Sequence, residues 1–134
     1  MNCLYCGGPT QVKNSRHGKR KTQVWRRRTC TACQAVFTTH EQPELEKSLI
    51  INDNGTLIPF SNDKLFVSIY DSCKHRKKAA EDARALANTV IEKVLASGSS
   101  PELLKADLIE TVQKTLKAFD TAAYVQYSAF HKQR

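Results

Sequence analysis

A chain of 134 residues fits one ordinary domain or two small ones, and its first half has too few aliphatic residues for a large core. The net charge is +8, and residues 1–49 carry nine Lys/Arg against three Asp/Glu, which favours an anionic partner such as nucleic acid or a membrane surface. No stretch approaches the ~18 apolar residues of a membrane span and no signal-like apolar run opens the chain, so we expect a soluble, cytoplasmic protein that does not enter the membrane.

Four of the five cysteines form two C-x-x-C pairs, Cys3 with Cys6 and Cys30 with Cys33, separated by 23 residues. In a chain without a secretion signal, such pairs favour a metal site over disulfides. Two of these knuckles complete the four-thiolate shell of a closed structural zinc site, which leaves no open position for catalysis. A redox dithiol is the alternative, and the β pattern between the pairs argues against it. We predict one structural Zn²⁺ per chain, and we expect Gly7 and Gly8 to supply positive φ angles.

The segment around these pairs has the pattern of a small sheet. Gln11 to Ser15 and Gln23 to Thr29 are predicted strands around a turn at His17 to Arg20, and Val36 to Thr39 is a third. Zinc contributes roughly 10 to 16 kcal/mol of apparent binding free energy in such modules, so this third of the chain should unfold without it. Residues 1–44 are therefore predicted to be a zinc ribbon, ending in the polar, proline-containing stretch from Glu41 to Glu44.

Cations crowd this predicted ribbon. Zinc with four thiolates carries a formal charge of −2, which explains one or two cations but not the whole set. Strand alternation places Arg26 and Arg28 on one face and Arg27 on the other. Guanidinium groups suit phosphate oxygens and guanine edges. Against the simpler alternative of a solvated basic face, we expect nucleic acid to be contacted by Arg16, Lys19, Arg20, Arg26, Arg27 and Arg28.

Three ring-bearing residues near these cations have simpler interpretations. Trp25 can stack on a base, but a lone tryptophan more often packs a small ribbon, and packing is preferred. His17 and His40 are expected to be ordinary surface residues, because four cysteines already fill the zinc shell.

A second domain is predicted from Leu45 to the end of the chain, residues 45–134. Asn54-Gly55 between the apolar runs Leu49 to Ile51 and Leu57 to Phe60 predicts a β-hairpin. Four helices follow: one capped by Ser61 or Asn62, one from Ala79 to Ala96 ended by Ser97-Gly98, one starting at Ser100-Pro101, and one capped by Asp120. The predicted fold class is α+β, a small β ribbon followed by a mostly helical domain with a hairpin at its start.

Apolar residues at helical spacing predict the core of this domain. Cys73 falls on the first stripe and is expected to be a core thiol. The stripes are Leu65, Phe66, Ile69, Tyr70 and Cys73; Ala83, Leu86, Ala87, Val90, Ile91, Val94 and Leu95; Leu104, Leu108, Val112 and Leu116; and Tyr124, Tyr127 and Phe130.

Several short motifs occur in a specific order and spacing. Those within the four-cysteine ribbon are Ser15-Arg16, Arg26-Arg27-Arg28 and Phe37-Thr38-Thr39, and those after it are Pro59-Phe60, Asp63-Lys64-Leu65 and Ala123-Tyr124. Over nearly its whole length the chain resembles the ribonucleotide-reductase regulator family of bacterial repressors, the NrdR type. The resemblance implies that the ribbon binds double-stranded DNA at operator boxes upstream of reductase genes. It also implies that the second domain is an ATP-cone, which binds the nucleoside triphosphates ATP and dATP as allosteric ligands and sets the state of a homo-oligomer.

The chain departs from this family in the hairpin. The nucleotide site that the resemblance implies consists of Ile50, Asn52, Asp53 and Lys64. Two cations that face the phosphates in the family pattern are here Asn52 and Asp53, and a carboxylate repels a triphosphate. Losing charge-assisted bonds of this kind predicts weaker nucleotide binding. The cations left to compensate are Lys64, Lys74, Arg76, Lys77 and Lys78.

Two other functions are weighed against a zinc-dependent repressor. A zinc-ribbon factor that binds RNA or the ribosome would use the same basic face without operator specificity, and a repressor-like protein with a cone that no longer senses nucleotide is a variant of the first interpretation. An enzyme is not expected, because no Ser/His/Asp set, phosphate-binding loop or open metal site is present in the sequence.

Overall fold

The structure is a computed structural model that describes residues 1–131. The chain divides into two compact units, Met1 to Glu44 and a second from Leu45 onward. None of the helices in residues 1–131 combines the length and the apolar character that crossing a membrane requires.

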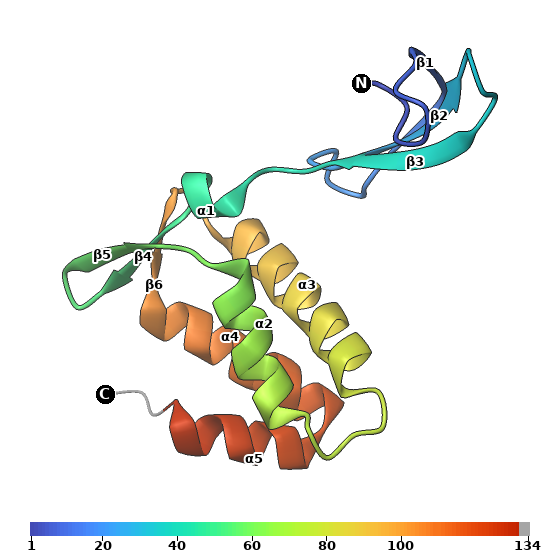
Figure 1. Cartoon of the computed structure of the whole chain (residues 1–134). Coiled ribbons are helices and arrows are strands. Elements are labelled where there is room, and N and C mark those ends of the chain that lie inside the picture. The colour runs from blue at the N-terminus through green and yellow to red at the C-terminus, as the bar shows by residue number, and fades with distance from the viewer. Residues whose placement is uncertain (132–134) are drawn as a thin grey trace. The chain divides into compact units, whose positions relative to one another are not determined.

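The first unit is built on an antiparallel sheet of order β1-β2-β3 (Figure 1). The strands are β1 Thr10–His17, β2 Val24–Cys30 and β3 Val36–Glu41. All three predicted strands are confirmed, with ends that differ by at most two residues. The buried core of this unit is small, consisting of Cys3, Cys30 and Phe37 with Ala35 packed against them. A core of this size agrees with the scarcity of aliphatic residues and leaves the unit dependent on another source of stability.

A β-bulge in β1 decides which side chains share a face of this sheet. Val12 lies opposite Arg28 and Asn14 lies opposite Arg27, so Lys13 is the extra residue. Bulges of this kind add one residue to one strand and so reset its alternation. Beyond the bulge, Arg16 therefore lies opposite Trp25, and the two side chains share a face of the sheet.

The second unit opens with the predicted hairpin, and β4 is the central strand of a sheet of order β5-β4-β6. The strands are β4 Ile50–Asp53, β5 Thr56–Pro59 and β6 Glu102–Leu104. The two turn residues, Asn54 and Gly55, have φ angles of 51° and 92°. Positive φ at both positions is what a two-residue hairpin turn of matching twist requires, and it explains Asn-Gly here.

The part of this unit up to residue 131 also contains five helices: α1 Leu45–Ser48, α2 Asn62–Ser72, α3 Ala79–Ser97, α4 Lys105–Phe119 and α5 Thr121–Phe130. Two predicted caps are confirmed. The backbone N–H of Lys64 donates to Ser61 Oγ at 3.2 Å, and that of Ala123 donates to Asp120 Oδ1 at 3.1 Å. Each cap satisfies a backbone donor that the helix itself leaves without a partner. The short helix α1 has no counterpart among the predicted elements.

One predicted helix start is wrong. Ser100-Pro101 does not begin the third long helix, because Glu102 to Leu104 form β6 and pair in parallel with Ile50 to Asn52. The backbone N–H of Ile50 also donates to Pro101 O at 2.8 Å. Residues 102–104 thus pair with the edge of β4 that β5 does not occupy, and helix α4 begins only at Lys105.

Three side chains placed in the predicted core are not buried. Leu104, Phe130 and Leu95 are 52%, 79% and 37% exposed. Leu104 belongs to β6 instead of a helix, whereas Phe130 is the last residue of α5. The remaining stripes do face the core, in which Ile69, Cys73, Val90, Val112 and Leu116 are fully buried. Cys73 is therefore a core thiol, as predicted, and its burial raises its pKa.

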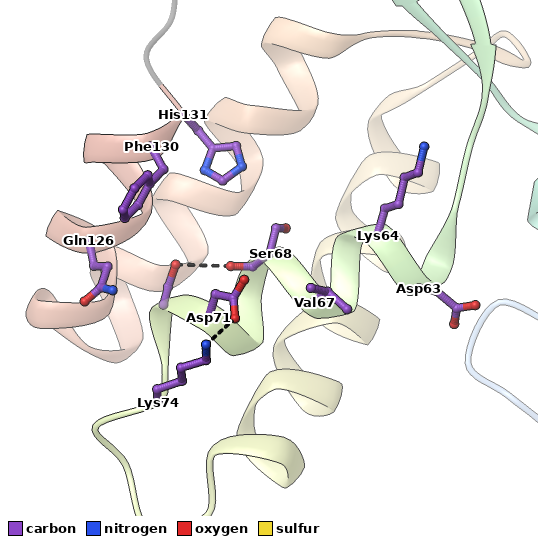
Figure 2. Close-up of a pocket in the computed structure, with 10 residues that line it drawn as sticks. Asp63, Lys64, Val67, Ser68, Asp71, Lys74, Gln126, Phe130 and His131 are labelled. Carbon is purple, nitrogen blue, oxygen red and sulfur yellow. Dashed lines mark hydrogen bonds and ion pairs between the residues drawn. The ribbon is translucent and has the colours of Figure 1, made fainter.

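A cavity of about 660 Å³ opens between α2 and the end of α5 (Figure 2). It is lined by Asp63, Lys64, Val67, Ser68, Asp71, Ser72, Lys74, Gln126, Phe130 and His131.

Candidate metal centre, basic face and cavity

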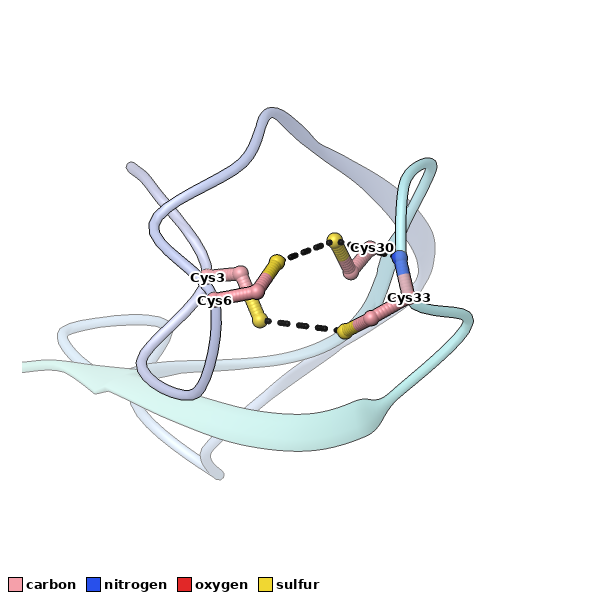
Figure 3. Close-up of side chains that lie close together, drawn as sticks. All are labelled: Cys3, Cys6, Cys30 and Cys33. Atoms are coloured by element: carbon pink, nitrogen blue, oxygen red, sulfur yellow. Dashed lines mark hydrogen bonds between the residues drawn. The ribbon is translucent and has the colours of Figure 1, made fainter.

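The four cysteines of the two C-x-x-C pairs converge on one point. Cys3 and Cys6 come from the turn that opens the chain, Cys30 ends β2, and Cys33 lies in the turn before β3. Their four sulfurs lie within 4.8 Å of one another. Two sulfur–sulfur contacts are marked by dashed lines in Figure 3: Cys3 Sγ lies 3.7 Å from Cys33 Sγ, and Cys6 Sγ lies 3.5 Å from Cys30 Sγ. Zn–S bonds of about 2.3 Å place tetrahedral sulfurs about 3.8 Å apart, so this donor set fits a zinc ion.

Backbone N–H groups point at these sulfurs. Tyr5 N lies 3.4 Å from Cys3 Sγ, and Ala32 N lies 3.3 Å from Cys30 Sγ. The pKa of the Cys30 thiol falls to about 6, first because the N–H of Cys33 faces its sulfur. The N–H of Ala35 acts likewise on Cys33, yet the surrounding thiols, Cys6 first, raise its pKa to about 12. Four crowded thiols thus ionise together only when a cation compensates their charge.

The two glycines after Cys6 have different roles. Gly7 has a φ of 74°, as predicted. Gly8 does not have a positive φ, so that part of the prediction is wrong. A Cβ at Gly8 would lie 3.1 Å from Ala32 Cβ and 3.3 Å from Cys6 Sγ. Glycine at this position is therefore needed because the two knuckles approach each other closely.

The sheet register separates the arginines into two groups. Arg27 pairs with Thr38, and Trp25 pairs with both His40 and Arg16. Residues in register share a face, as do alternate residues of one strand. Arg16, Trp25, Arg27, Thr38 and His40 therefore lie on one face, which we call the RW face.

Arg26 and Arg28 lie on the opposite face of β2, as predicted from alternation, and both have partners. Arg26 lies 3.7 Å from a carboxylate oxygen of Glu41, and Arg28 Nε donates to Thr39 Oγ1 at 3.1 Å. The side chains of Arg16 and Arg27 make no hydrogen bond or ion pair within residues 1–131, and both residues are exposed. The RW face therefore presents the two guanidinium groups that are available to an external anion.

The predicted packing of Trp25 agrees with the structure. Its ring stacks on His40, with centroids 4.3 Å apart and an angle of 10° between planes. Trp25 also closes over the β1–β2 loop, where a Cβ at Gly18 would lie 3.4 Å from its ring. Lys19 and Arg20 occupy this same loop, and both are exposed. His40 is exposed, as expected, but it is a stacking partner and not an isolated surface residue.

The residues of the implied nucleotide site do not all come together. Lys64 lines the cavity between α2 and α5, whereas Ile50, Asn52 and Asp53 belong to β4 and are not part of its lining. Lys74 also lines it, with its amino group 2.8 Å from Asp71. Arg76 is held elsewhere, by Asp82 at 2.7 Å and Asp120 at 2.8 Å.

Sequence reasoning missed the cavity residues at the end of the chain that the structure describes, which are Gln126 and Phe130 of α5 and His131 just after it. His131 stacks on Tyr127 at 4.0 Å and its Nδ1 lies 3.0 Å from Tyr127 O. No spacing signal marks these residues, because only the approach of α5 to α2 brings them beside Lys64. Helix α5 also carries no acidic or basic residue in its first or last turn.

A four-cysteine ribbon with a basic sheet, joined to a helical unit with a hairpin at its start, defines a zinc-ribbon regulator. The model of the NrdR-like transcriptional repressor N-terminal domain matches residues 1–41, and that of the ATP cone domain matches residues 48–133. Proteins named transcriptional repressor NrdR are 35% identical over 98% of this chain in Methylorubrum extorquens PA1 (71% of that protein), 33% in Bradyrhizobium diazoefficiens (82%) and 34% in Phenylobacterium zucineum (85%). The chain belongs to the NrdR family of transcriptional repressors, which are regulators and not enzymes.

Proposed function

We propose that this chain is a zinc-dependent, DNA-binding repressor of ribonucleotide reductase genes that acts in the cytoplasm. Its family membership supports repression. The main observation in support of DNA binding is the arrangement of side chains on the RW face. That face presents two exposed guanidinium groups next to the Trp25–His40 stack: Arg16 lies opposite Trp25 on β1, and Arg27 lies two residues further along β2. Fork-shaped cations suit phosphates and guanine edges, and an aromatic floor suits bases or sugars.

The other cations of the ribbon act around this face. Lys19 and Arg20 extend the positive field into the β1–β2 loop. Arg26 and Arg28 tie β2 to β3 through Glu41 and Thr39, so they hold the strand that carries Arg27. Cys3, Cys6, Cys30 and Cys33 hold a structural zinc, which fixes the end of β2.

For the second unit we propose that ATP or dATP binds in the cavity between α2 and α5, with its phosphates extending past Lys64 toward Asn52 and Asp53 of the hairpin, which lie outside the cavity lining. Lys64 has no ion pair among residues 1–131, and Phe130 supplies an exposed ring (Figure 2). The two lysines that line the cavity, Lys64 and Lys74, are balanced in charge by Asp63 and Asp71. Since a triphosphate needs several compensating charges, we propose weaker binding than in proteins with cations at positions 52 and 53. A cone without nucleotide sensing is the second candidate, favoured by the internal contacts of Asn52 and Asp53.

We also propose that the chain forms a homo-oligomer. Val125 and Phe130 of α5 are 60% and 79% exposed, and apolar side chains on the outside of a helix suit contact with another chain. Mass in solution, measured with and without ATP, tests this point.

The deciding experiment compares three nucleic acids by fluorescence anisotropy: a duplex from upstream of a reductase gene, a scrambled duplex, and a structured RNA of equal length. We expect the operator duplex to bind tightest, with affinity falling as salt rises. A Lys114→Ala variant, altered on α4 of the other unit, serves as the matched control for loss of one cation. Equal affinity for the RNA would instead support the RNA-binding alternative.

A further inference from the structure

The tip of the β4–β5 hairpin is attached to the rest of the second unit by two side chains. Asn52 Nδ2 donates to Glu102 Oε1 at 2.6 Å, and Asn52 Oδ1 accepts from the N–H of Gly55 at 2.8 Å. One amide thus joins the turn of the hairpin to the first residue of β6. Both hydrogen-bonding ends of this side chain are used.

Asp53 makes the second attachment. Its Oδ2 lies 2.9 Å from Nζ of Lys105, the first residue of α4. The two side chains are 38% and 48% exposed, so water partly screens the pair. Asp53 is the last residue of β4, and the ion pair therefore connects the end of the central strand to the start of a helix.

These contacts lie within the backbone ladder and just past its end. The parallel pairing of β4 with β6 runs from Ile50 opposite Glu102 to Asn52 opposite Leu104, so the Asn52–Glu102 hydrogen bond is a diagonal contact within the ladder. The Asp53–Lys105 ion pair lies one residue past the ladder and continues the connection there. We call the group Asn52, Asp53, Glu102 and Lys105 the hairpin clasp.

The charges of the hairpin clasp disfavour phosphate. Asp53 and Glu102 are acidic and Lys105 is the one cation among the four, so the formal charge of the group is negative. Lys105 is directed to Asp53 and is compensated by it. An incoming phosphate would have to displace a carboxylate to reach this cation.

We propose that the hairpin clasp holds the β4–β5 hairpin in place without any bound nucleotide, so that the position of the hairpin is set by the protein alone. The proposal goes beyond the proposed function, because it requires neither DNA binding nor nucleotide binding. Lys105 and Glu102 are positioning residues for the hairpin.

Hydrogen exchange of amides 50–58 in the full-length, zinc-loaded protein tests the proposal. Asp53→Asn removes the charge with little change of shape, and Lys105→Met removes its partner. An exposed ion pair of this kind corresponds to an exchange rate up to about fivefold faster in each single variant. The double variant should be no faster than the faster single variant, because the same contact is lost. Lys114→Met is the matched control, since Lys114 pairs with Glu110 on the same helix at 2.6 Å.

Addition of ATP completes the test. We expect the hairpin amides of the unaltered protein to exchange at the same rate with and without ATP. We also expect slow exchange to be restored in the charge-swapped double variant, Asp53→Lys with Lys105→Asp. Clear slowing of these amides by ATP, additive single variants, or an effect of Lys114→Met as large as that of Lys105→Met would overturn the proposal. Should Lys105→Met loosen the start of α4, Asp53→Asn alone decides. Operator affinity is measured separately, so its loss would refute the proposed function without touching this result.

Discussion

Trp25 and His40 stack across strands β2 and β3 at a centroid distance of 4.3 Å, and both lie on the face of the sheet that carries Arg27. A tryptophan that only filled a core would be buried, whereas Trp25 is half-buried against an exposed histidine. The stack therefore forms part of the outer surface and gives the neighbouring guanidinium groups a rigid, flat support.

Arg27→Ala and Arg16→Ala are expected to weaken operator binding, because both side chains are exposed and without internal partners within residues 1–131. Each phosphate contact that is lost should flatten the plot of log affinity against log salt by about 0.9. Arg26→Ala should cost less affinity, since Arg26 pairs with Glu41. Titrations at several salt concentrations measure both quantities, and a larger loss in Arg26→Ala than in Arg27→Ala would contradict the assignment of the RW face.

Removal of zinc is expected to unfold residues 1–44 and leave the helical unit folded. The core of the first unit is only Cys3, Cys30 and Phe37, so the metal supplies most of its stability. Elemental analysis should give one zinc per chain, and amide signals of residues 1–44 should collapse on chelation. Cys73→Ala, in the other unit, should keep its zinc, whereas Cys30→Ser should not. A folded first unit in metal-free, reduced protein would disprove this expectation.

Replacing Asn52 with Lys and Asp53 with Arg is expected to tighten ATP binding. The change supplies two cations and releases Lys105 from Asp53. Calorimetry measures the affinity, and Lys64→Met in the same background should reduce it again, because Lys64 lines the cavity. Tight binding by the unaltered protein, with no gain from the double replacement, would show that other residues hold the phosphates.

Asp120 is expected to make the stability of the helical unit depend on pH. Hydrogen bonds from His75 and Arg76, and one from the backbone of Ala123, hold its pKa well below the usual range. A carboxylate with a lowered pKa stabilises the fold above its unfolded pKa of about 3.9 and loses that contribution as pH falls further. Asp120→Asn keeps the cap but should lower the unfolding free energy by about 1 to 2 kcal/mol at neutral pH.

Urea unfolding followed by circular dichroism, which reports mainly on the helices, measures this effect. The difference between the unaltered protein and Asp120→Asn should shrink below about pH 4. Asp120→Ala should lose about 1 kcal/mol more, because the helix cap is lost as well. If the unfolding free energies of the unaltered protein and Asp120→Asn differed by the same amount from neutral to acid pH, the charge of the carboxylate would be excluded as the cause.

Tyr127 and Phe130 are expected to differ sharply although both are aromatic residues of one helix. Tyr127 is 3% exposed and Phe130 is 79% exposed. Tyr127→Ala should cost about 3 to 5 kcal/mol of unfolding free energy, whereas Phe130→Ala should stay within about 0.5 kcal/mol. Unfolding is measured at a dilution at which the chain is monomeric, so that contacts between chains do not contribute. Equal losses would mean that α5 packs on its other side.

The features that could be predicted from sequence are those with a local chemical signal. The two C-x-x-C pairs, the Asn54-Gly55 turn and the caps at Ser61 and Asp120 each need a particular residue at a particular spacing. Strand β6 has no such signal. Its three residues become a strand only because the edge of β4 is free beside them, and tertiary pairing of this kind overrides local preference.

The functional surfaces show the same division. The set of arginines is evident from sequence, but the partners that occupy Arg26 and Arg28 follow from the register of β2 and β3. Likewise, the sequence shows that Asn52 and Asp53 replace two cations of the family pattern. Their contacts to Glu102 and Lys105 could not be predicted, because they join residues about 50 positions apart. Apolar residues are spread around helix α5 instead of forming one stripe, so its periodicity alone does not separate buried Tyr127 from exposed Phe130.

The parallel pairing of β4 with β6 has a consequence for biosynthesis. The β4–β5 hairpin needs only neighbouring residues and forms within about 10 μs, whereas β6 follows about 45 residues after Pro59. At about 5 to 20 residues per second, the ribosome needs roughly 2 to 9 s to make that stretch. During this time one edge of β4 is open to pairing with other nascent chains. The polar pair Asn52 and Asp53 lies on that edge, where charge and polarity oppose such pairing until β6 emerges to cover it.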